Sequence, residues 1–306
     1  MRNKIHIFSL MCILLGVSSV YSQDTLNNPS MAVSTLNMFR EPSYILFGSG
    51  IGNMNPLMFE GDIVPYYLLS LKRNIKWGIQ LSPRIIVRME NMYSHPVRTP
   101  SFIPTITFFY HLIDSKNESR DLFTYCSWYH HSNGQEGDFY ETDSIAINTT
   151  SGSFYSNWIE GGVFLSRPDR NLSNTFNYIK LSMAYNYMLN NELIGNYGQL
   201  RFFADFQSTI NLSKAFRIFR SSDNNRSVIL SQSVRFGWIA DNLSDSKTID
   251  KNRLIFRYTL SFKPSFFKDV SLFCQYYYGQ DYYNINFGKT LNVIRFGISS
   301  KIKIFN

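Results

Sequence analysis

A histidine and a serine two residues apart are the side chains of this sequence best placed to do chemistry. His130 and Ser132 stand at the end of a strand-like run that starts at residue 122. Because side chains at positions i and i+2 of a strand share a face, the imidazole and the hydroxyl point the same way. A serine hydroxyl becomes a strong nucleophile when a neighbouring base takes its proton, and an imidazole is the usual base. The spacing therefore indicates nucleophilic catalysis.

Strands with one apolar and one polar face must position this pair. Between residues 77 and 90 the odd positions are apolar, whereas the even positions include Arg84 and Arg88, and a similar alternation recurs between residues 290 and 305. About 9–11 residues of tilted strand cross a membrane, and both segments are longer. The pattern predicts that Val87 meets lipid and that the arginines line a barrel interior. On this basis Val87→Arg should cost about 2–4 kcal/mol near the bilayer midplane, and Arg88→Gln far less.

Twelve segments show a strand pattern, so the sequence predicts an all-β protein, a 12-stranded antiparallel transmembrane β-barrel. The segments lie near residues 43–50, 65–73, 76–90, 101–112, 122–133, 153–167, 175–188, 196–206, 227–239, 252–264, 269–279 and 290–305. After the N-terminal segment, no stretch reaches the roughly 18 unbroken apolar residues of a membrane helix. The 26 Phe and 20 Tyr, at a mean hydropathy of −0.17, are typical of a barrel, although a secreted β-sandwich has a similar composition.

The first residues have the pattern of a secretory signal. Arg2 and Lys4 precede an apolar run over residues 5–17, and small side chains stand where a signal peptidase would cut before Gln23. We therefore expect a signal peptide at residues 1–22 and one mature domain at residues 23–306. Without the signal, 28 Lys and Arg face 22 Asp and Glu, a modest net charge of +6, and no nucleic-acid partner is expected.

The segment at 153–167 adds a third polar group to the same wall. Its odd positions are mostly apolar and are therefore predicted to face lipid, and Asn157 occupies an odd position near one end. In the segment at 122–133, His130 and Ser132 share a face with apolar side chains. A porin has no use for polar groups toward lipid, where they carry a desolvation cost. An enzyme whose substrate is the lipid does.

These motifs resemble the active-site region of the bacterial outer-membrane phospholipase A family. The resemblance rests on His130-x-Ser132-Asn133-Gly134 and on Ser153-x-x-x-Asn157. Two further segments look like the calcium loop of the family and the turn after its penultimate strand, namely residues 94–104 and 278–284. In order and approximate spacing the resemblance covers most of residues 90–306.

The resemblance implies a calcium-dependent outer-membrane phospholipase, of type A1 or A2, that hydrolyses acyl esters of membrane phospholipids with a Ser-His-Asn triad. Ser132 would be the nucleophile, His130 the general base and then general acid, and Asn157 the group that fixes the imidazole tautomer. The backbone N–H of Gly134 is the candidate oxyanion donor.

The resemblance also implies a calcium ion and a homodimer. Calcium would be held by the backbone carbonyl of Gln135, the hydroxyl of Ser153 and the carbonyl of Ser94 from a second subunit, a set of hard oxygens that suits this cation. The sequence departs from the family where Gln135 replaces a common arginine. It also departs in the longer segment between Gly134 and Ser153, and in having no clear match for a remote acidic ligand of the family.

Two other readings stay open on the sequence. The first is a non-enzymatic outer-membrane barrel, either a channel or a scaffold; retention of His130, Ser132 and Asn157 together favours the enzyme over it. The second is a soluble secreted esterase, which fractionation would find free of the membrane. Cys126 and Cys274 fall in mid-strand and far apart, so two free thiols are expected rather than a disulfide.

Overall fold

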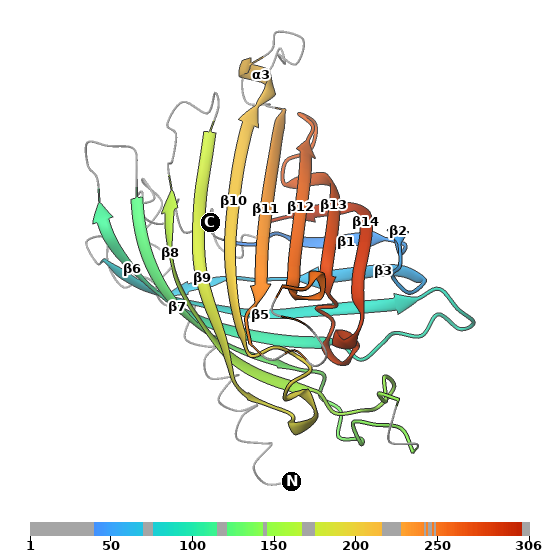
Figure 1. Cartoon of the computed structure of the whole chain (residues 1–306). Coiled ribbons are helices and arrows are strands. Elements are labelled where there is room, and N and C mark those ends of the chain that lie inside the picture. The colour runs from blue at the N-terminus through green and yellow to red at the C-terminus, as the bar shows by residue number, and fades with distance from the viewer. Residues whose placement is uncertain are drawn as a thin grey trace.

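The computed structural model describes residues 40–69, 76–114, 121–142, 146–166, 175–215, 228–241, 243, 247 and 249–301. In this part of the chain, regular structure is almost entirely β-strand (Figure 1). The strands are β1 (Ser43–Phe47), β2 (Ile51–Gly52), β3 (Leu57–Ile63), β4 (Tyr67–Leu69), β5 (Trp77–Glu90), β6 (Ser101–Asp114), β7 (Asp121–Ser132), β8 (Tyr155–Ser166), β9 (Thr175–Leu189), β10 (Leu200–Asn211), β11 (Ile229–Ile239), β12 (Leu254–Lys263), β13 (Val270–Gln280) and β14 (Thr290–Ser300). The helical turns are η2 (Asn191–Leu193), α3 (Leu212–Ala215), η4 (Lys251–Arg253) and η5 (Asn284–Gly288).

The strands form one closed antiparallel barrel. They pair in the order β1, β3, β5 and then β6 to β14, and the pairing of β1 with β14, which sets Ser43 opposite Ser300, closes the sheet. The short β2 continues β1 along β14, and β4 continues β3 along β5. Counted over the described residues, the barrel has twelve strand positions, so the predicted 12-stranded antiparallel β-barrel is confirmed.

The second strand position differs from the sequence prediction. A strand was predicted at 65–73, but β3 and the short β4 fill the position, and residues 70–75 lie outside the described part of the chain. Glu60 and Asp62 make β3 look like a loop in the sequence. In the barrel both carboxylates face inward, where Glu60 contacts Arg88 at 2.7 Å and Asp62 contacts Arg84 at 2.5 Å. Ion pairing across neighbouring strands makes the acidic strand possible.

The strand predicted at 196–206 is also displaced. It begins at Leu200 and continues to Asn211. The residues before it form η2 and a turn in which Gly195 and Gly198 take φ angles of 80° and 82°. Glycine adopts these left-handed conformations easily. The two glycines complete the turn, so the strand begins only at Leu200.

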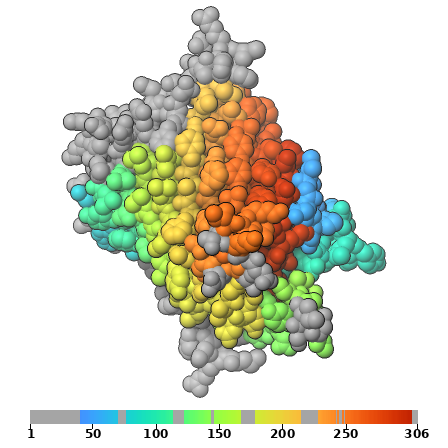
Figure 2. Space-filling model, viewed as in Figure 1, coloured from blue at the N-terminus to red at the C-terminus, as the bar shows by residue number. Residues whose placement is uncertain are grey.

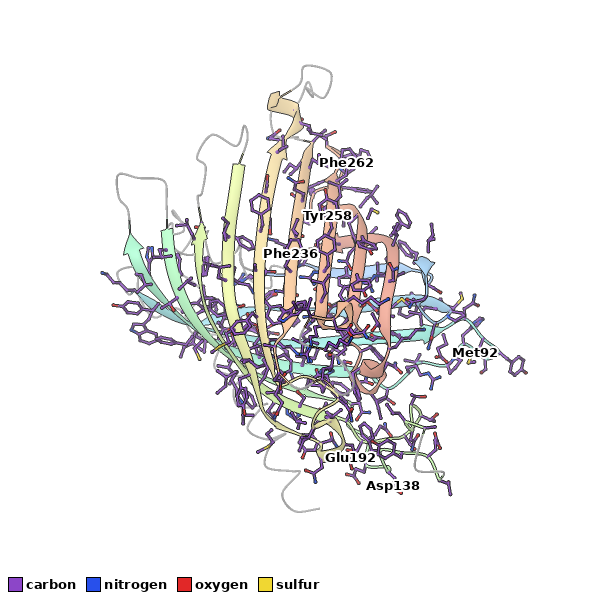
Figure 3. The ribbon with its side chains drawn as sticks, in the orientation of Figure 1. Met92, Asp138, Glu192, Phe236, Tyr258 and Phe262 are labelled. Carbon is purple, nitrogen blue, oxygen red and sulfur yellow. The ribbon has the colours of Figure 1, made fainter. Side chains whose placement is uncertain are left out.

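Exposed apolar side chains at alternate positions form the outer wall of the barrel. On β8, Ile159 and Val163 are exposed whereas Glu160 is buried, which confirms the predicted phase of this strand. Figure 3 shows Phe236 on β11 with Tyr258 and Phe262 on β12 along the same wall. In the space-filling view, the side chains of β10 to β14 form a continuous surface (Figure 2). An outer wall of this kind can face hydrocarbon, because the backbone polar groups are paired within the closed sheet.

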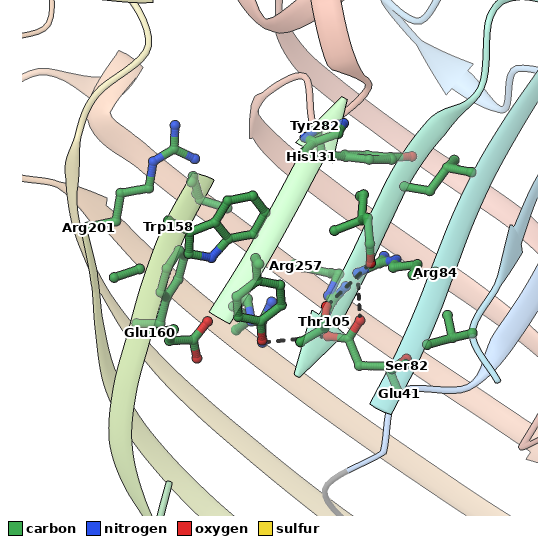
Figure 4. Close-up of a pocket in the computed structure, with 18 of the residues that line it drawn as sticks. Glu41, Ser82, Arg84, Thr105, His131, Trp158, Glu160, Arg201, Arg257 and Tyr282 are labelled. Carbon is green, nitrogen blue, oxygen red and sulfur yellow. Dashed lines mark hydrogen bonds and ion pairs between the residues drawn. The ribbon is translucent and has the colours of Figure 1, made fainter. Parts of the chain in front are cut away.

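Ion pairs fill much of the barrel interior. Glu41, just before β1, contacts Arg84, Arg235 and Arg257 at 3.2, 3.5 and 2.9 Å. A second group joins Arg88 and Arg295 to acidic and phenolic side chains. The predicted inward direction of Arg84 and Arg88 is therefore confirmed, and Arg295 also points inward. A cavity of about 250 Å³ remains among these groups, and Figure 4 shows part of its lining.

Three loops pack together at one end of the barrel. They are the β7–β8, β9–β10 and β13–β14 connections, which an antiparallel barrel brings to the same rim. One apolar cluster joins them and contains Phe139, Phe154, Leu189, Leu193, Tyr197, Ile285 and Phe287. Packing at this rim supports the segments that follow Ser132 and precede Asn157.

The remaining predictions fall partly inside and partly outside the described residues. Cys126 and Cys274 are free thiols, as expected. The predicted signal peptide at residues 1–22 and the C-terminal residues 302–306 lie outside the described residues. No helix within the described ranges is long and apolar enough to span a membrane.

Candidate active site

The β7–β8 pairing places a histidine directly opposite an asparagine. His130 and Asn157 are register partners in the two strands, and His130 Nδ1 lies 2.6 Å from Asn157 Oδ1. An amide oxygen only accepts hydrogen bonds, so Nδ1 carries the proton and donates it. This tautomer leaves Nε2 as a proton acceptor, which is the state a general base needs. Asn157 is only 7 % exposed although it belongs to the outward face of β8, so the imidazole and its neighbours cover it.

Ser132 lies on the same outward face of β7, two residues beyond His130. It is half-buried, and its register partners are Phe102 on β6 and Tyr155 on β8, both of which are exposed. Among the described residues, His130 makes its side-chain hydrogen bond to Asn157 and none to the Ser132 hydroxyl. Nucleophile–base hydrogen bonds are often long without substrate and tighten in the complex. Because the exposed Phe102 and Tyr155 flank it, the Ser132 hydroxyl has apolar surroundings that are open to the outside of the barrel.

Aromatic side chains flank the histidine on the outer wall. Trp128 lies two residues before His130, and their rings are nearly parallel, at 16°, with centroids 6.5 Å apart. The Trp128 indole N–H donates to the hydroxyl of Tyr187 on β9 at 2.6 Å. Tryptophan and tyrosine with their polar atoms paired are typical of the membrane–water boundary. The His130–Asn157 pair thus lies where such a boundary would pass.

Gly134 follows Ser132 by two residues and leaves the strand by a sharp turn. Its φ is 68°, a left-handed conformation that glycine adopts without steric cost, and the residue is exposed. Its N–H has no hydrogen-bond partner within the described part of the chain. A free backbone N–H beside a nucleophile can bind the oxygen of a developing oxyanion.

The described residues between Gly134 and Ser153, 135–142 and 146–152, fold as a small lobe of their own. Gly137 and Gly152 form a bridge, and Tyr140 pairs with residue 147. A Cβ at Gly152 would lie 2.4 Å from the carbonyl oxygen of Asn148, so this close approach requires glycine. The described part of this longer segment thus forms a packed lobe that rests on the apolar cluster of the rim.

The predicted calcium ligands lie in two places. Gln135 and Ser153 belong to neighbouring segments of the lobe, because the N–H groups of Gln135 and Phe154 both donate to Asn133 Oδ1, at 3.2 and 3.0 Å. Ser94 belongs to the β5–β6 loop, where it is exposed and has a φ of 65°. In Figure 3 Met92 of this loop lies far from Asp138 of the lobe. The structure of one chain brings Gln135 and Ser153 together, whereas Ser94 belongs to a different loop, which reaches the lobe through Arg98, whose guanidinium donates to the carbonyl of Thr149 at 3.5 Å.

The oxygens at the lobe fit calcium in kind. A backbone carbonyl and a hydroxyl are hard, neutral ligands of the type that calcium accepts. Across the described ranges, no group of three or more His, Cys, Asp or Glu side chains is arranged to hold a metal. A site at Gln135 and Ser153 would therefore depend on neutral oxygens.

His131 points to the other side of the sheet. It is buried, packs edge-on against Phe154 and Trp158, and lines the interior cavity (Figure 4). The two adjacent histidines therefore face opposite sides of the wall and cannot share a metal. Of the two, only His130 can reach a substrate in the lipid phase.

The β13–β14 loop supports the rim through residues that sequence reasoning took only as a resemblance. Asp281 binds Arg88 through two hydrogen bonds of 2.9 and 3.0 Å. The Tyr283 hydroxyl donates to the carbonyl of Thr99 at 3.0 Å, and burial raises the pKa of Tyr283 to about 12, so the phenol stays protonated. Asn284 also donates to Thr99. The Tyr282-Tyr283-Asn284 run indicated this loop in the sequence, but the residues that the loop contacts, such as Thr99, are far away in the chain.

Comparison with known proteins gives similarity at the level of structure. No protein-family model matches the chain, and no curated protein matches it in sequence. Outer membrane phospholipase A from Escherichia coli superposes with a TM-score of 0.55 at 10 % identity, over 85 % of this chain and 92 % of that chain. The Salmonella typhi enzyme, solved as a dimer with bound calcium, gives 0.53 at 12 % identity, over 87 % and 96 %.

A third solved structure is that of an active-site mutant of the Escherichia coli enzyme in which an asparagine is replaced by alanine. It superposes with a TM-score of 0.52 at 12 % identity, over 87 % of this chain and 96 % of that chain. The apolar outer wall and the closed sheet fit an outer-membrane protein. The chain has the barrel fold of the outer membrane phospholipase A structures.

Proposed function

We propose that the protein is a calcium-dependent outer-membrane phospholipase that hydrolyses the acyl ester bonds of glycerophospholipids. The observation that carries the proposal is the 2.6 Å contact between His130 Nδ1 and Asn157 Oδ1 on the outward face of the barrel. A polar pair in this place carries a desolvation cost that a purely structural wall has no reason to bear. The barrel fold shared with solved phospholipases supports the same reading.

The chemistry follows from the tautomer that Asn157 fixes. Ser132 Oγ attacks the ester carbonyl carbon while His130 Nε2 takes its proton, and a tetrahedral intermediate forms. The C–O bond to the lysophospholipid then breaks, and His130 returns the proton to the leaving alcohol oxygen. Water, deprotonated by His130, attacks the acyl-serine; the bond between the acyl carbon and Ser132 Oγ breaks, His130 returns the proton to Ser132 Oγ, and the fatty acid is released. The amide of Asn157 orients the imidazole of His130 without placing a negative charge in a buried position.

The oxyanion and metal roles complete the proposal. The Gly134 N–H donates to the carbonyl oxygen as charge develops on it. Gln135 would hold calcium through its carbonyl and Ser153 through its hydroxyl. When bound there, calcium would supply positive charge close to the oxyanion.

We further propose that the active form is a homodimer. Ser94 of the partner subunit would then supply a carbonyl to the same calcium ion, in keeping with its exposed position on a loop separate from the Gln135 and Ser153 segments. One similar solved phospholipase is a dimer with bound calcium, which supports this arrangement.

The interior gives little support to the alternative of a non-enzymatic channel. Arg84, Arg235 and Arg257 converge on Glu41 inside the barrel, and the cavity that these groups line is about 250 Å³. Wide porin barrels instead enclose a continuous aqueous channel.

Fatty-acid release from phospholipid vesicles by the refolded protein tests the proposal. Calcium-stimulated release that is lost in excess chelator and in Ser132→Ala is the expected result. Full activity of a folded Ser132→Ala variant would exclude the assigned nucleophile, and no release by the wild-type protein under any calcium concentration would favour the non-enzymatic barrel.

A further inference from the structure

Asn133 is a buried amide between the nucleophile and the candidate oxyanion donor. It is 3 % exposed and is the first residue after β7. Its position gives it no access to a substrate on the outer wall. Its effect on chemistry must therefore pass through the backbone that it holds.

All the hydrogen-bonding capacity seen for this side chain is directed at two backbone segments. Oδ1 accepts from the N–H groups of Gln135, at 3.2 Å, and of Phe154, at 3.0 Å. Nδ2 donates to the carbonyl of Gly152 at 2.8 Å. The backbone N–H of Asn133 also donates to the carbonyl of Phe154, at 3.1 Å. One side chain thus fastens the segment that follows Ser132 to the segment that precedes β8.

We propose that Asn133 is a positioning residue that holds the Gly134 N–H and the Gln135 carbonyl in fixed relation to Ser132 and Ser153. The inference rests on the proposed function, because it assigns Gly134 to the oxyanion and Gln135 and Ser153 to calcium. A donor must be held within hydrogen-bond distance of the oxyanion before the reaction starts, since reorganisation during the reaction would reduce its benefit.

The turn at Gly134 needs the restraint that the hydrogen bonds of Asn133 provide. With a φ of 68° and an exposed position, Gly134 has no side chain to pack and no backbone partner for its N–H among the described residues. Glycine also has the largest choice of backbone conformations. The hydrogen bonds of Asn133 on either side are what restrict it.

Asn148 offers a matched control within the same lobe. Its side chain also makes several local hydrogen bonds, accepting from the N–H of Thr150 and of Ser151 and donating to the carbonyl of Asp138. It does not contact the backbone of residues 134 and 135. Asn148→Ala therefore loosens the lobe without releasing the proposed oxyanion and metal segments.

The test compares Asn133→Ala, Asn133→Asp, Asn148→Ala and Ser132→Ala in the refolded full chain, with heat-modifiable gel mobility as the check of folding. The readouts are kcat and KM for vesicle hydrolysis and, independently of activity, the affinity for terbium measured by luminescence and by competition with calcium. Asn133→Ala should lower kcat about 100-fold, as removal of one oxyanion donor does, with little change in KM. It should weaken terbium binding by about tenfold, as loss of an outer-shell contact does.

The other variants separate the possible explanations. Asn133→Asp keeps both acceptor contacts, so it should recover most of the terbium affinity. Its kcat should remain low, because the donor to Gly152 is lost and a negative charge stands near the oxyanion. If Asn133→Ala does not fold, Asn133→Asp carries the test, and an unchanged kcat in that variant overturns the inference.

Two results would directly refute the positioning role of Asn133. One is a folded Asn133→Ala with wild-type kcat and terbium affinity. The other is an equal loss in Asn148→Ala, which would assign the effect to order of the lobe as a whole. Hydrolysis by Ser132→Ala would instead refute the proposed function, and the terbium measurements would still decide whether Asn133 holds the Gln135 and Ser153 segments together.

Discussion

Arg88→Gln is expected to destabilise the barrel far more than the alternation of the sequence suggests. The strand pattern places Arg88 inside, where a charge in a small barrel is easily replaced. In the structure, however, Arg88 is 5 % exposed and binds Glu60 at 2.7 Å and both carboxylate oxygens of Asp281 at 2.9 and 3.0 Å. Its guanidinium also lies 4.4 Å from the ring centre of Tyr283.

The magnitude follows from what the substitution leaves behind. Glu60 keeps Arg295 and the hydroxyls of Tyr44 and Tyr282 as partners. Asp281 is 4 % exposed and retains the N–H of Tyr283, so it becomes a buried carboxylate without its cation. Breaking a buried ion pair on one side costs about 3–5 kcal/mol. We expect a loss of this size in the free energy of unfolding.

The assay is denaturant unfolding from lipid bilayers, followed by tryptophan fluorescence and extrapolated to zero denaturant. The double variant Arg88→Gln/Asp281→Asn removes the uncompensated charge and should recover about 0.5–3 kcal/mol relative to Arg88→Gln, the coupling range of contacting residues. A loss in Arg88→Gln below about 0.5 kcal/mol, the range of ordinary surface changes, would refute the reasoning. Additive losses of stability from Arg88→Gln and Asp281→Asn in the double variant would also refute it.

The other predictions concern the wall, the triad and the metal. Val87→Arg should cost about 2–4 kcal/mol if the residue lies near the midplane, and unfolding in bilayers as stable as wild type would contradict the outward phase of β5. Ser132→Ala and His130→Ala should each lower hydrolysis by several orders of magnitude and the double variant little further, because members of a triad act as a unit; additive losses in vesicle assays would argue against that. Asn157→Ala should be milder, since it disturbs orientation rather than bond making. Calcium titration with cross-linking should show more dimer as calcium rises and a weaker response in Ser153→Ala, because binding and association at a shared site strengthen each other; dimer formation independent of calcium would count against the shared site.

The sequence determined the class of fold and the faces of its strands. Alternation at a period of two assigns every side chain of a long strand to one face or the other, so the outward phase of Ile159 and the inward phase of Arg84 could be predicted without coordinates. The same rule placed His130 and Asn157 on the same wall. Alternation fails where inward positions are acidic, which is why β3 was missed: Glu60 and Asp62 are compatible with a strand only because arginines stand nearby in the barrel.

Contacts between strands and loops were decided by tertiary structure. That His130 stands opposite Asn157 depends on the register of β7 and β8, and a shift of one residue would turn one side chain to the other face. The burial of Asn133, the partners of Asp281 and the packed lobe before Ser153 depend likewise on segments far apart in the chain. Local sequence records what a residue can donate or accept, whereas the closure of the barrel determines which distant group it meets, and that meeting fixes the geometry available for chemistry.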